Sequence, residues 1–259
     1  MFDKLVWQKD RMLLDDLVFR LAHDKDADWD LGDNCFEFFK IKVLTDQYAK
    51  FLSLRRDFRP ENVFELGIWD GGSVAFWFEC FRPKKHVAVD LATREDSSYF
   101  RRYVSSRGLA NRIKTYWETD QEDSAKLKQI VAAEFSGPLD LVIDDASHLY
   151  GPTKASFETL FPLLRPGGYY LIEDWAWPLW EGFQAGPPGS ELTKLVFELV
   201  EATGSTLASI ADLAVFQGFV AVERSEVGTA ELGAFKLEHH IYRQPTRSVL
   251  QRILNKLKG

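Results

Sequence analysis

The sequence has few cysteines, a deficit of positive charge and no long apolar run. Only Cys35 and Cys80 occur among 259 residues, which argues against a disulfide scaffold or a zinc ribbon and favours a reducing compartment. Lys and Arg number 32 against 39 Asp and Glu, a net charge of −7, which argues against a broad basic face for nucleic acid. No apolar run reaches the roughly 18 residues of a membrane span, and we see no signal-peptide core. We expect a cytoplasmic protein that binds neither nucleic acid nor membranes.

The glycine-rich segment ELGIWDGGS, residues 65–73, lacks the spacing of two common nucleotide-binding motifs. Its Gly-x3-Gly-Gly pattern differs from the Gly-x-Gly-x2-Gly of dinucleotide-binding proteins, which disfavours a nicotinamide oxidoreductase, and it has no Gly-Lys-Ser/Thr of a P-loop. The segment joins a predicted strand at Asn62–Leu66 to a predicted helix at Val74–Phe81, where glycines let the backbone approach a nucleotide-like ligand closely. The candidate contacts to such a ligand are Glu65, Gly67, Gly71 and Ser73.

The most informative stretch runs from residue 139 to 175 and reads LDLVIDDASHLYGPTKASFETLFPLLRPGGYYLIEDW. Two short apolar runs in it, Leu139–Ile143 and Tyr169–Ile172, have the length of buried strands. Between them lies a helical pattern that stops at Arg165-Pro166-Gly167-Gly168. Strand, helix and strand predict a βαβ unit, in which the two strands are parallel.

Acidic residues end both of these strands. Asp144 and Asp145 follow the first, Glu173 and Asp174 follow the second, and His148 comes shortly after the first pair. Because the carboxyl ends of parallel strands meet at the crevice where ligands bind, we expect these side chains to converge. Carboxylates at one place repel each other unless some are protonated, hydrogen-bonded or neutralised by a cation. Capping or ion pairing of the acids, and a purely structural role for His148, are the alternatives.

Two further strand ends carry polar side chains. Asp90 ends a predicted strand that begins at His86, about twenty residues past the glycines, where an acid can accept hydrogen bonds from both ribose hydroxyls of a nucleoside. Asp120 and Gln121 follow a predicted strand at Arg112–Tyr116, where either side chain can read the amino group of an adenine. The same turn can instead cap the predicted helix Asp123–Phe135.

The chain divides into three predicted parts: a helical cap (1–58), a core (59–225) and a C-terminal extension (226–259). The cap is predicted because apolar residues between Met12 and Leu21 recur at helical spacing and because a second helical pattern covers Lys42–Leu54. Aromatic residues of the cap can form a lid over a site, or they can pack against the core, which we favour for most of them.

The second half of the chain contains a long aromatic connection and two terminal elements. Residues 176–188 hold two Trp, one Phe and three Pro, and we predict a substrate-gating loop there. A helix at Leu192–Thr203 precedes a predicted antiparallel strand pair at Ala208–Asp212 and Ala214–Glu223. Thr246–Lys258 forms a basic amphipathic pattern, for which packing on its own domain or on a sister subunit is favoured over a membrane.

Taken together, these motifs resemble those of the class I S-adenosylmethionine-dependent methyltransferases. Within that superfamily the chain is similar to the macrocin and mycinamicin sugar O-methyltransferases and their cephalosporin-hydroxylase-like relatives. The similarity rests on ELGIWDGGS (65–73), VAVD (87–90), TDQED (119–123), IDDASH (143–148) and LRPGGYYLIEDW (164–175). It implies an α/β fold: a Rossmann-like, doubly wound, seven-stranded, mostly parallel sheet that ends in an antiparallel hairpin.

The resemblance also implies a function and a set of site residues. It implies magnesium-dependent O-methylation of a small-molecule hydroxyl, on a sugar or another natural product, by a protein that we expect to form a homo-oligomer. S-adenosylmethionine would contact the glycine segment, Asp90, Asp120, Gln121 and Asp144. The metal carboxylates fall on Asp145, Glu173 and Asp174, and the general base falls on His148.

The chemistry of methyl transfer suits these residue types. An alcohol must lose its proton before its oxygen attacks the sulfonium methyl group, and its free pKa is far too high at neutral pH. Mg²⁺ prefers carboxylate and water oxygens and lowers the proton affinity of a bound oxygen, and a vicinal diol can bind it through both oxygens. A histidine has an unperturbed pKa near 6.5 and can accept the proton. A metal-independent enzyme in which His148 acts alone and a non-catalytic S-adenosylmethionine-binding protein are the alternatives.

Overall fold

The computed structural model describes residues 2–21, 34–182, 186–205, 209–226 and 235–243. Within those ranges no helix is both long and apolar enough to cross a bilayer. The predicted amphipathic helix at 246–258 lies outside the described residues.

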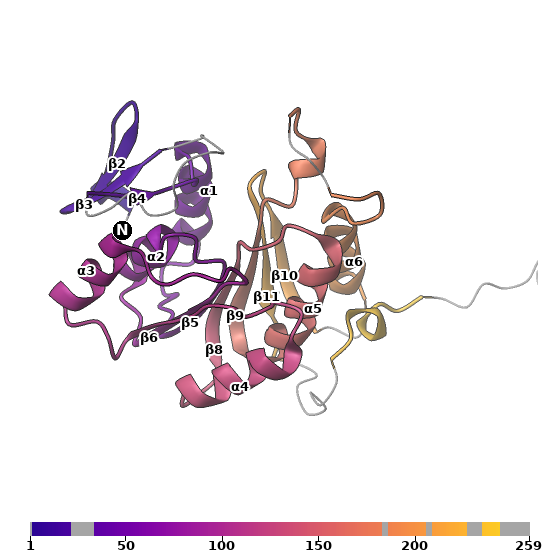
Figure 1. Ribbon diagram of the computed structural model, residues 1–259. Helices are drawn as coiled ribbons and strands as arrows, with labels where there is room; N and C mark the ends of the chain where they lie inside the picture. Colours follow the sequence, from indigo (N-terminus) through magenta and orange to yellow (C-terminus); the bar gives the residue numbers. More distant parts are fainter. Residues whose placement is uncertain (1, 22–33, 183–185, 206–208, 227–234, 244–259) are drawn as a thin grey trace, which may run out of the picture.

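A seven-stranded sheet forms the centre of the fold (Figure 1). Its strands are β5 (Asn62–Leu66), β6 (Lys85–Val89), β7 (Ile113–Tyr116), β8 (Leu139–Asp144), β9 (Leu164–Glu173), β10 (Ile210–Val215) and β11 (Phe219–Arg224). They lie in the order β10-β11-β9-β8-β5-β6-β7. The five strands from β7 to β9 in this order pair in parallel, whereas β11 runs antiparallel to both β9 and β10. The predicted mostly parallel sheet with an antiparallel terminal pair is confirmed.

Helices cover both faces of this sheet, as a doubly wound fold requires. They are α1 (Lys42–Ser53), α2 (Gly72–Phe81), α3 (Ser98–Ser106), α4 (Ser124–Glu134), α5 (Tyr150–Leu160) and α6 (Thr193–Thr203). Figure 1 shows α2 and α3 on one side of the sheet and α4 and α5 on the other. Successive residues of a strand belong to two different apolar cores. Val63 of β5 packs in the core that includes α1, α2 and α3, whereas Phe64 packs in the core that includes α4, α5 and α6. Because successive side chains of a strand point to opposite faces, a strand buried on both sides carries apolar residues at most of its positions.

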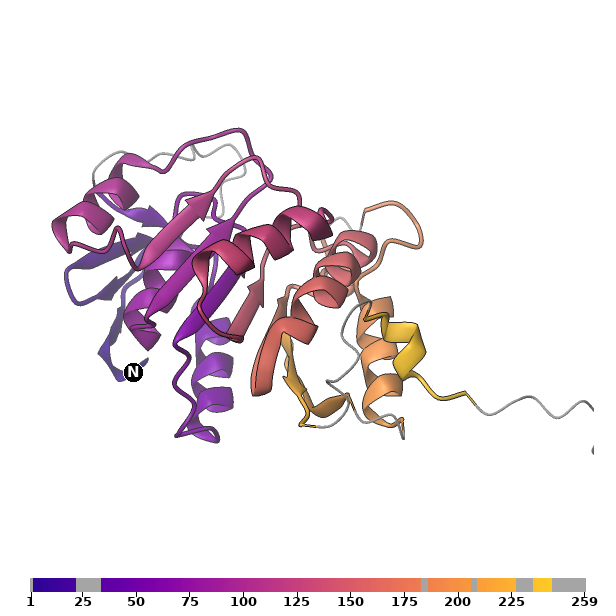
Figure 2. The same ribbon diagram turned by 90° about the horizontal axis from the view of Figure 1, so that it is seen from below.

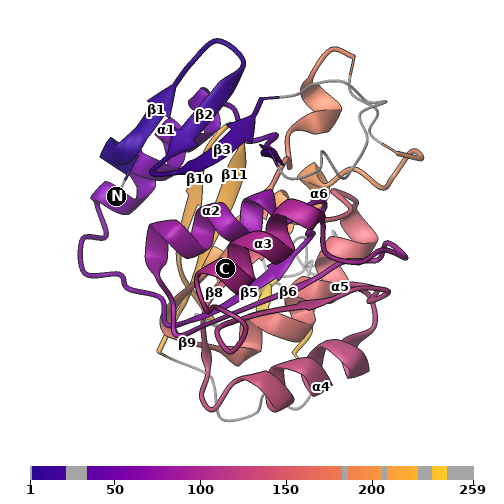
Figure 3. The ribbon, with the colours of Figure 1, turned by 60° about the vertical axis from the view of Figure 1, so that its left-hand side comes forward.

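The N-terminal part differs from the predicted helical cap. Residues 5–20 form three antiparallel strands, β1 (Leu5–Trp7), β2 (Arg11–Leu14) and β3 (Leu17–Arg20), and β4 (Phe36–Glu37) adds in parallel to β3. Figure 3 shows this small sheet beside α1. The helical prediction for residues 12–21 is wrong, because a two-residue turn at Asp15-Asp16 splits the apolar run, and Asp15 adopts a left-handed φ of 53°. Only the second predicted helix of the cap forms, as α1.

Buried and more exposed residues alternate along two strands of the N-terminal sheet, which is the pattern of a strand and not of a helix. In β2 and β3, Met12, Leu14, Leu17 and Phe19 are buried while their neighbours along the strand are more exposed. The buried side chains belong to the same core as α2, and the ring of Phe19 lies 6.4 Å from that of Phe76. A run of apolar residues satisfies helical and strand patterns at once, and here the buried partner surface selects the strand.

Three smaller elements depart from the predicted bounds. β9 begins at Leu164, so the Arg-Pro-Gly-Gly segment predicted as a stop is the first part of a ten-residue strand. The terminal hairpin is confirmed as β10 and β11, but its turn falls at 216–218 and not at Leu213. A short 3-10 helix, Leu237–His240, packs against α6 (Figure 2).

The strand order creates a topological switch point between β5 and β8. From β5 the chain proceeds outward through β6 to β7 and then returns to β8 on the other side of β5. Helices on opposite faces diverge at such a point, and the carboxyl ends of the strands there open into a crevice that binds ligands. The sequence motifs that follow the parallel strands therefore lie together at this edge of the sheet.

Candidate active site

A cavity of about 1120 Å³ opens at the carboxyl edge of the sheet. Its wall contains residues from the ends of five strands: Gly67 after β5, Asp90 after β6, Asp120 after β7, Asp145 after β8 and Asp174 after β9. Of the four strand-end acids that the sequence predicts to converge with His148, Asp145 and Asp174 line the cavity, whereas Asp144 and Glu173 do not. A cavity of this size can hold a nucleoside cofactor together with a second small molecule.

Two glycines allow the turn between β5 and α2 to close tightly. Gly67 has a φ of 98°, and a Cβ atom there would lie 2.2 Å from the carbonyl oxygen of Asp145. Gly71 has a φ of 91°, and a Cβ there would lie 2.4 Å from the ring of Phe100. Both positions therefore require glycine. Gly67 lines the cavity, whereas Gly71 supports the turn from behind and does not line it.

Ser73 stands in the first turn of α2 and lines the cavity. Its Oγ atom is buried and has no hydrogen-bond partner within the described residues. Buried polar atoms in native proteins are almost always paired, so this hydroxyl is suited to a ligand oxygen or amine. The backbone N–H groups at the start of a helix add a preference for a negatively charged group such as a carboxylate.

The carboxylate of Asp90 fixes the glycine turn from the neighbouring strand end. Its Oδ2 accepts hydrogen bonds from the backbone N–H of Ile68 at 2.8 Å and of Trp69 at 3.1 Å, and its Oδ1 accepts one from Ala92 at 2.8 Å. A carboxylate has about four acceptor sites, so capacity remains for a ribose hydroxyl. Asp90 lines the cavity and thus joins the turn to the place of the predicted nucleoside.

Asp120 and Gln121 both line the cavity beyond the end of β7. Asp120 also accepts a hydrogen bond from the backbone N–H of Glu122 at 2.9 Å. The amide of Gln121 is buried: its oxygen accepts from the N–H of Ser147 at 3.0 Å, and its nitrogen donates to the hydroxyl of Ser156 at 3.3 Å. The predicted helix N-cap at this turn is Asp123, which accepts from Lys126, so Asp120 and Gln121 are not the capping residues.

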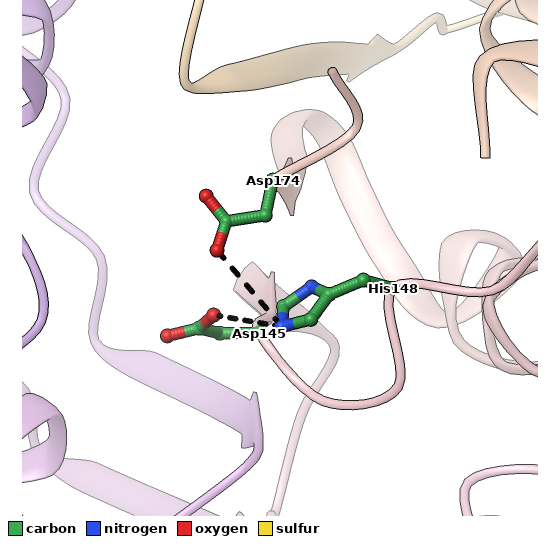
Figure 4. A group of neighbouring side chains, drawn as sticks. All are labelled: Asp145, His148 and Asp174. Atoms are coloured by element: carbon green, nitrogen blue, oxygen red, sulfur yellow. Dashed lines mark ion pairs between the residues drawn. The ribbon is translucent and has the colours of Figure 1, made fainter. Parts of the chain in front are cut away.

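His148 lies between two carboxylates on the cavity wall (Figure 4). Its Nε2 atom is 3.8 Å from Oδ1 of Asp145 and 3.9 Å from Oδ2 of Asp174. The three side chains offer ligand or proton-accepting atoms that all lie within 4.8 Å of one another. On its other side the imidazole packs against the indole of Trp177, with ring centroids 4.3 Å apart. The sequence prediction that His148 joins the acidic cluster is correct.

The backbone at this cluster is held in a sparsely populated conformation. His148 has a φ of 54° and Asp174 has a φ of 55°, both in the left-handed region that side chains other than glycine enter rarely. Such residues persist only where surrounding contacts hold them, and they gather at functional sites. Asp174 is held by its N–H, which donates to the carbonyl of Gly218 at 2.8 Å.

Burial shifts the pKa values of the cluster in opposite directions. Desolvation lowers the pKa of His148 below its usual 6.5, although the charge of Asp145 opposes this shift. Desolvation, together with the charge of Asp145, raises the pKa of Asp174 to about 7. At neutral pH the imidazole is therefore uncharged, with a lone pair that can accept a proton.

Glu173 does not face the cavity with the other two predicted metal ligands. Its Oε2 accepts a hydrogen bond from Nζ of Lys40 at 2.6 Å, and its Oε1 accepts one from the hydroxyl of Tyr48 at 2.6 Å. The same Lys40 ammonium donates to Oδ2 of Asp145 at 2.6 Å. Lys40 is 3% exposed and Glu173 is 1% exposed, so this is a buried ion pair shared by two carboxylates.

The segment that carries Lys40 is tied to the glycine turn. Lys40 lies between β4 and α1, and the backbone N–H of Glu37 in β4 donates to Asp70 at 2.6 Å. The side chain of Glu37 accepts a hydrogen bond from the indole N–H of Trp69 at 2.8 Å. Sequence reasoning missed Lys40 and Tyr48. The available signal was a single lysine inside the apolar run Phe38-Phe39-Lys40-Ile41, because a lysine buried in such a run needs an acidic partner.

The described side chains do not fit a magnesium ion held by three carboxylates. Both oxygens of Glu173 are already paired, and the Lys40 ammonium stands between Glu173 and Asp145. The set that does converge, Asp145, Asp174 and His148, has two carboxylates and an imidazole. Mg²⁺ prefers an octahedral shell of oxygen ligands. The metal therefore needs a rearrangement of Lys40 before the predicted three acids can share it.

Two predicted cofactor contacts lie elsewhere. The Glu65 carboxylate is fully buried inside the sheet and lies 2.8 Å from Nε2 of His86 on the adjacent strand. The Asp144 carboxylate points away from the cavity and accepts hydrogen bonds from the hydroxyls of Tyr170 and Ser156, each at 2.7 Å. Neither residue lines the cavity. Asp144 is the last residue of β8 and points into the core, whereas Asp145 follows the strand and lines the cavity.

Aromatic residues surround the mouth of the cavity. Trp177 and Trp180 of the predicted gating loop line it, as do Phe39 and Trp69. Phe39 is 50% exposed, and its ring lies 5.8 Å from that of Trp69. Most of the described aromatics of the cap pack into the core instead, among them Phe36, Phe38 and Tyr48, as the interpretation that we favour predicts. Trp29 lies outside the described residues.

Comparisons with known proteins agree with this architecture. Residues 64–175 match the model of a family described as a methyltransferase domain. The 8-demethyl-8-alpha-L-rhamnosyl tetracenomycin-C 2'-O-methyltransferase of Streptomyces olivaceus is 34% identical over 164 residues, which are 61% of this chain and 39% of that protein. Demethylmacrocin O-methyltransferase of Streptomyces fradiae is 36% identical over 151 residues, which are 54% and 35% of the two chains.

A solved structure extends the likeness to three dimensions. The MycE methyltransferase from the mycinamycin biosynthetic pathway, in complex with Mg, SAH and mycinamycin VI, superposes with a TM-score of 0.56 at 30% identity. The match covers 73% of this chain and 53% of MycE. The chain thus spans well under half the length of the two curated relatives named above and about half of MycE.

Proposed function

We propose that the chain transfers a methyl group from S-adenosylmethionine to a hydroxyl oxygen, on the premise that residues 64–175 match the model of a methyltransferase domain. The observation that carries the proposal is the position of His148. It lies between Asp145 and Asp174 on the wall of the same cavity that the glycine turn and Asp90 line.

The cofactor would occupy the part of the cavity nearest the glycine turn. Asp90 would accept hydrogen bonds from the ribose hydroxyls, and Asp120 and Gln121 lie where the adenine would be read. The unpaired hydroxyl of Ser73, at the start of α2, suits the carboxylate end of the cofactor. Bound there, the cofactor supplies an electrophilic methyl group, and the acidic wall favours its positive sulfonium.

His148 would take the proton from the acceptor hydroxyl. A general base works best when its pKa lies near the operating pH, and burial keeps His148 neutral and able to accept. Asp145 and Asp174 stand beside its Nε2 and stabilise the positive charge that the ring gains with the proton. Trp177 packs on the ring and limits its orientations. These four side chains hold the proton-accepting nitrogen of His148 in place before the substrate that carries the hydroxyl group binds.

The acceptor that the cavity fits best is a neutral molecule with apolar surface. Asp145 and Asp174 would repel a carboxylate, whereas a hydroxyl can donate to His148 and to the acids. The exposed rings of Phe39 and Trp69 and the indoles of Trp177 and Trp180 provide contact area for the rest of the molecule. Since one similar protein is named as the 2'-O-methyltransferase of a rhamnosyl tetracenomycin, we propose a sugar hydroxyl of a natural product.

Magnesium dependence stays a prediction. MycE was solved with Mg, but Lys40 occupies the space between Asp145 and Glu173 in this chain. No step of the proposed proton transfer requires an ion, since the base, its two acidic neighbours and the cofactor suffice. Turnover before and after exhaustive treatment with a chelator separates the metal-dependent enzyme from one in which His148 acts without metal.

Labelled methyl transfer tests the proposed function. The protein would be incubated with S-adenosylmethionine carrying a radioactive methyl group and with two matched sets of apolar acceptors, one of neutral glycosides and one of carboxylic acids. We expect labelled ether products from the glycosides and none from the acids. Labelled esters alone would contradict a neutral acceptor. Absence of any transfer across both sets, in a protein that binds the cofactor, would favour the non-catalytic alternative.

A further inference from the structure

Lys40 is an almost fully buried lysine in a place where the resemblance implies a metal. Its ammonium lies 2.6 Å from oxygens of both Asp145 and Glu173, and its side chain is 3% exposed. Burying an ammonium is unfavourable unless it is paired and hydrogen-bonded. Here the ammonium has both: it donates one hydrogen bond to each of the two carboxylates. The side chain therefore occupies the site as a paired cation.

The surroundings of Lys40 match those of a bound cation. Glu173 is held from its other oxygen by Tyr48, whose ring stacks on that of Phe219 at 4.1 Å. Asp145 is held through its backbone N–H, which donates to the carbonyl of Leu66 at 2.9 Å. Two fixed carboxylates thus face one ammonium, which donates one hydrogen bond to each.

An ion and this ammonium cannot share the two carboxylates. A divalent ion bound by Asp145 and Glu173 would lie within a few ångströms of Nζ, and like charges so close repel strongly in a buried site. For the ion to bind, Lys40 would have to leave, and its four-carbon stem would have to move out of the wall of the cavity, where it now lies. The segment around it is fixed by the Glu37–Asp70 and Glu37–Trp69 hydrogen bonds.

We propose that Lys40 is the resident cation of this site and excludes a divalent ion from the position between Asp145 and Glu173. The chain then neutralises its strand-end carboxylates with its own side chain. The exclusion of metal is independent of the reaction. Its consequence, that turnover persists in the presence of a chelator, rests on the proposed methyl transfer.

Binding of Mn²⁺ tests this inference without reference to activity. Metal-stripped wild-type protein with bound adenosylhomocysteine would be titrated with MnCl2, and bound ion would be followed by electron paramagnetic resonance. The variant Lys40→Met keeps the length of the side chain and removes its charge. We expect Lys40→Met to bind Mn²⁺ at least about 100-fold more tightly than the wild type, since a like charge at contact distance is removed. Adding Glu173→Gln to that variant should abolish the gained binding, since Glu173 is the carboxylate that only this position uses.

Matched controls separate the site from general effects of charge and folding. Lys42→Met removes a lysine two positions away that is exposed and pairs with Asp46, and it should leave Mn²⁺ binding as in the wild type. The affinity of each variant for adenosylhomocysteine, measured by calorimetry, shows whether the cofactor part of the cavity is intact. A protein that does not bind adenosylhomocysteine would contradict the proposed function, whatever its Mn²⁺ binding. Lys40→Met leaves buried acids without a partner and risks unfolding.

The wild-type titration decides the question even if that variant does not fold. Wild-type protein that binds Mn²⁺ in a manner abolished by Glu173→Gln would overturn the proposal, because Glu173 belongs to the position between the two carboxylates and not to the cluster of Asp145, His148 and Asp174. A folded Lys40→Met variant that gains no Mn²⁺ binding would overturn it as well. Wild-type protein without such binding, together with the gain in Lys40→Met, is the result that the proposal requires.

Discussion

The ammonium of Lys40 lies 2.6 Å from the carboxylate of Glu173, which stands 133 residues further along the chain. This contact joins the segment between β4 and α1 to the end of β9, and Tyr48 of α1 adds a second hydrogen bond to the same carboxylate. The N-terminal region therefore completes the acidic edge of the central sheet. It contributes the positive charge that the strand ends of the core lack.

Tyr48→Phe should destabilise the protein without weakening cofactor binding. The change removes the hydroxyl that donates to Glu173 and leaves a buried carboxylate oxygen without this donor, which costs about 1–3 kcal/mol in the free energy of unfolding. Denaturant unfolding measures the loss. Tyr242→Phe is the matched control, since Tyr242 is 57% exposed. Equal stability of the two variants would show that the Tyr48 hydroxyl contributes nothing.

His148→Gln should abolish most of the turnover and spare the cofactor. Loss of a general base lowers kcat by about 10²–10⁴-fold, whereas the affinity for S-adenosylmethionine should stay as in the wild type, because the proposed role of His148 is toward the acceptor hydroxyl and not toward the cofactor. The comparison requires an acceptor identified by methyl transfer. His239→Gln, in the 3-10 helix near the C-terminus, is the control. A kcat within twofold of the wild type would reject the role of base (about 0.4 kcal/mol in barrier).

Turnover should fall in acid with a midpoint below pH 6.5. Desolvation lowers the pKa of His148, the charge of Asp145 opposes that shift, and the charge of Lys40 assists it. Above this pKa the ring is neutral and accepts a proton, and below it the lone pair is lost, so kcat/KM rises with pH and then levels off. A profile measured from pH 5 to 8 tests the sign. An acid limb centred above pH 6.5 would show that the charge of Asp145 outweighs burial.

Asp144→Ala should act on stability and not on ligand binding. Asp144 accepts hydrogen bonds from Tyr170 and Ser156 in the core, and its removal leaves both hydroxyls buried without this acceptor. We expect a loss of about 1–3 kcal/mol in the free energy of unfolding and an unchanged affinity for S-adenosylmethionine. Thermal unfolding and calorimetry on the same samples measure the two quantities. A large loss of affinity in a variant of normal stability would restore Asp144 as a cofactor contact.

The core of the fold could be predicted from the sequence because local and long-range signals agree there. The apolar runs that end in Asp90, Asp145 and Asp174 are short, and each is followed by a helix or a turn, which fits parallel strands alone. β5 has the predicted bounds, Asn62–Leu66. The convergence of the acids then follows from the geometry of a parallel sheet.

The N-terminal sheet could not be predicted in the same way. The apolar residues from Met12 to Phe19 fit a helix by spacing, and only the packing of Phe19 on Phe36, Phe38 and Phe76 favours the strands. Such contacts join segments far apart in the sequence. The missed role of Lys40 has the same cause, because its partners lie 105 and 133 residues away.

Two differences from the predicted site arise at the ends of β8 and β9, where the last residue of the strand and the residue after it point in different directions. Asp144 and Asp145 are the same residue type and adjacent in the sequence. Asp144 nevertheless contacts hydroxyl groups in the core, whereas Asp145 lies on the cavity wall. Glu173 and Asp174 separate similarly, since Glu173 ends β9 and Asp174 turns away with a φ of 55°. Deciding which acid faces the ligand requires the register of the strand and the backbone conformation after it.

Calorimetric binding of S-adenosylmethionine to the wild type, to Asp90→Ala and to Asp46→Ala tests the central claim most directly. We predict saturable binding to the wild type and to Asp46→Ala, whose carboxylate pairs with Lys42 on the surface. Asp90→Ala should bind about 10- to 100-fold more weakly, because it loses acceptors for the ribose and for the N–H groups of the glycine turn. Absence of saturable binding to the wild type would contradict the account, and equal affinity in all three proteins would remove Asp90 from the cofactor site.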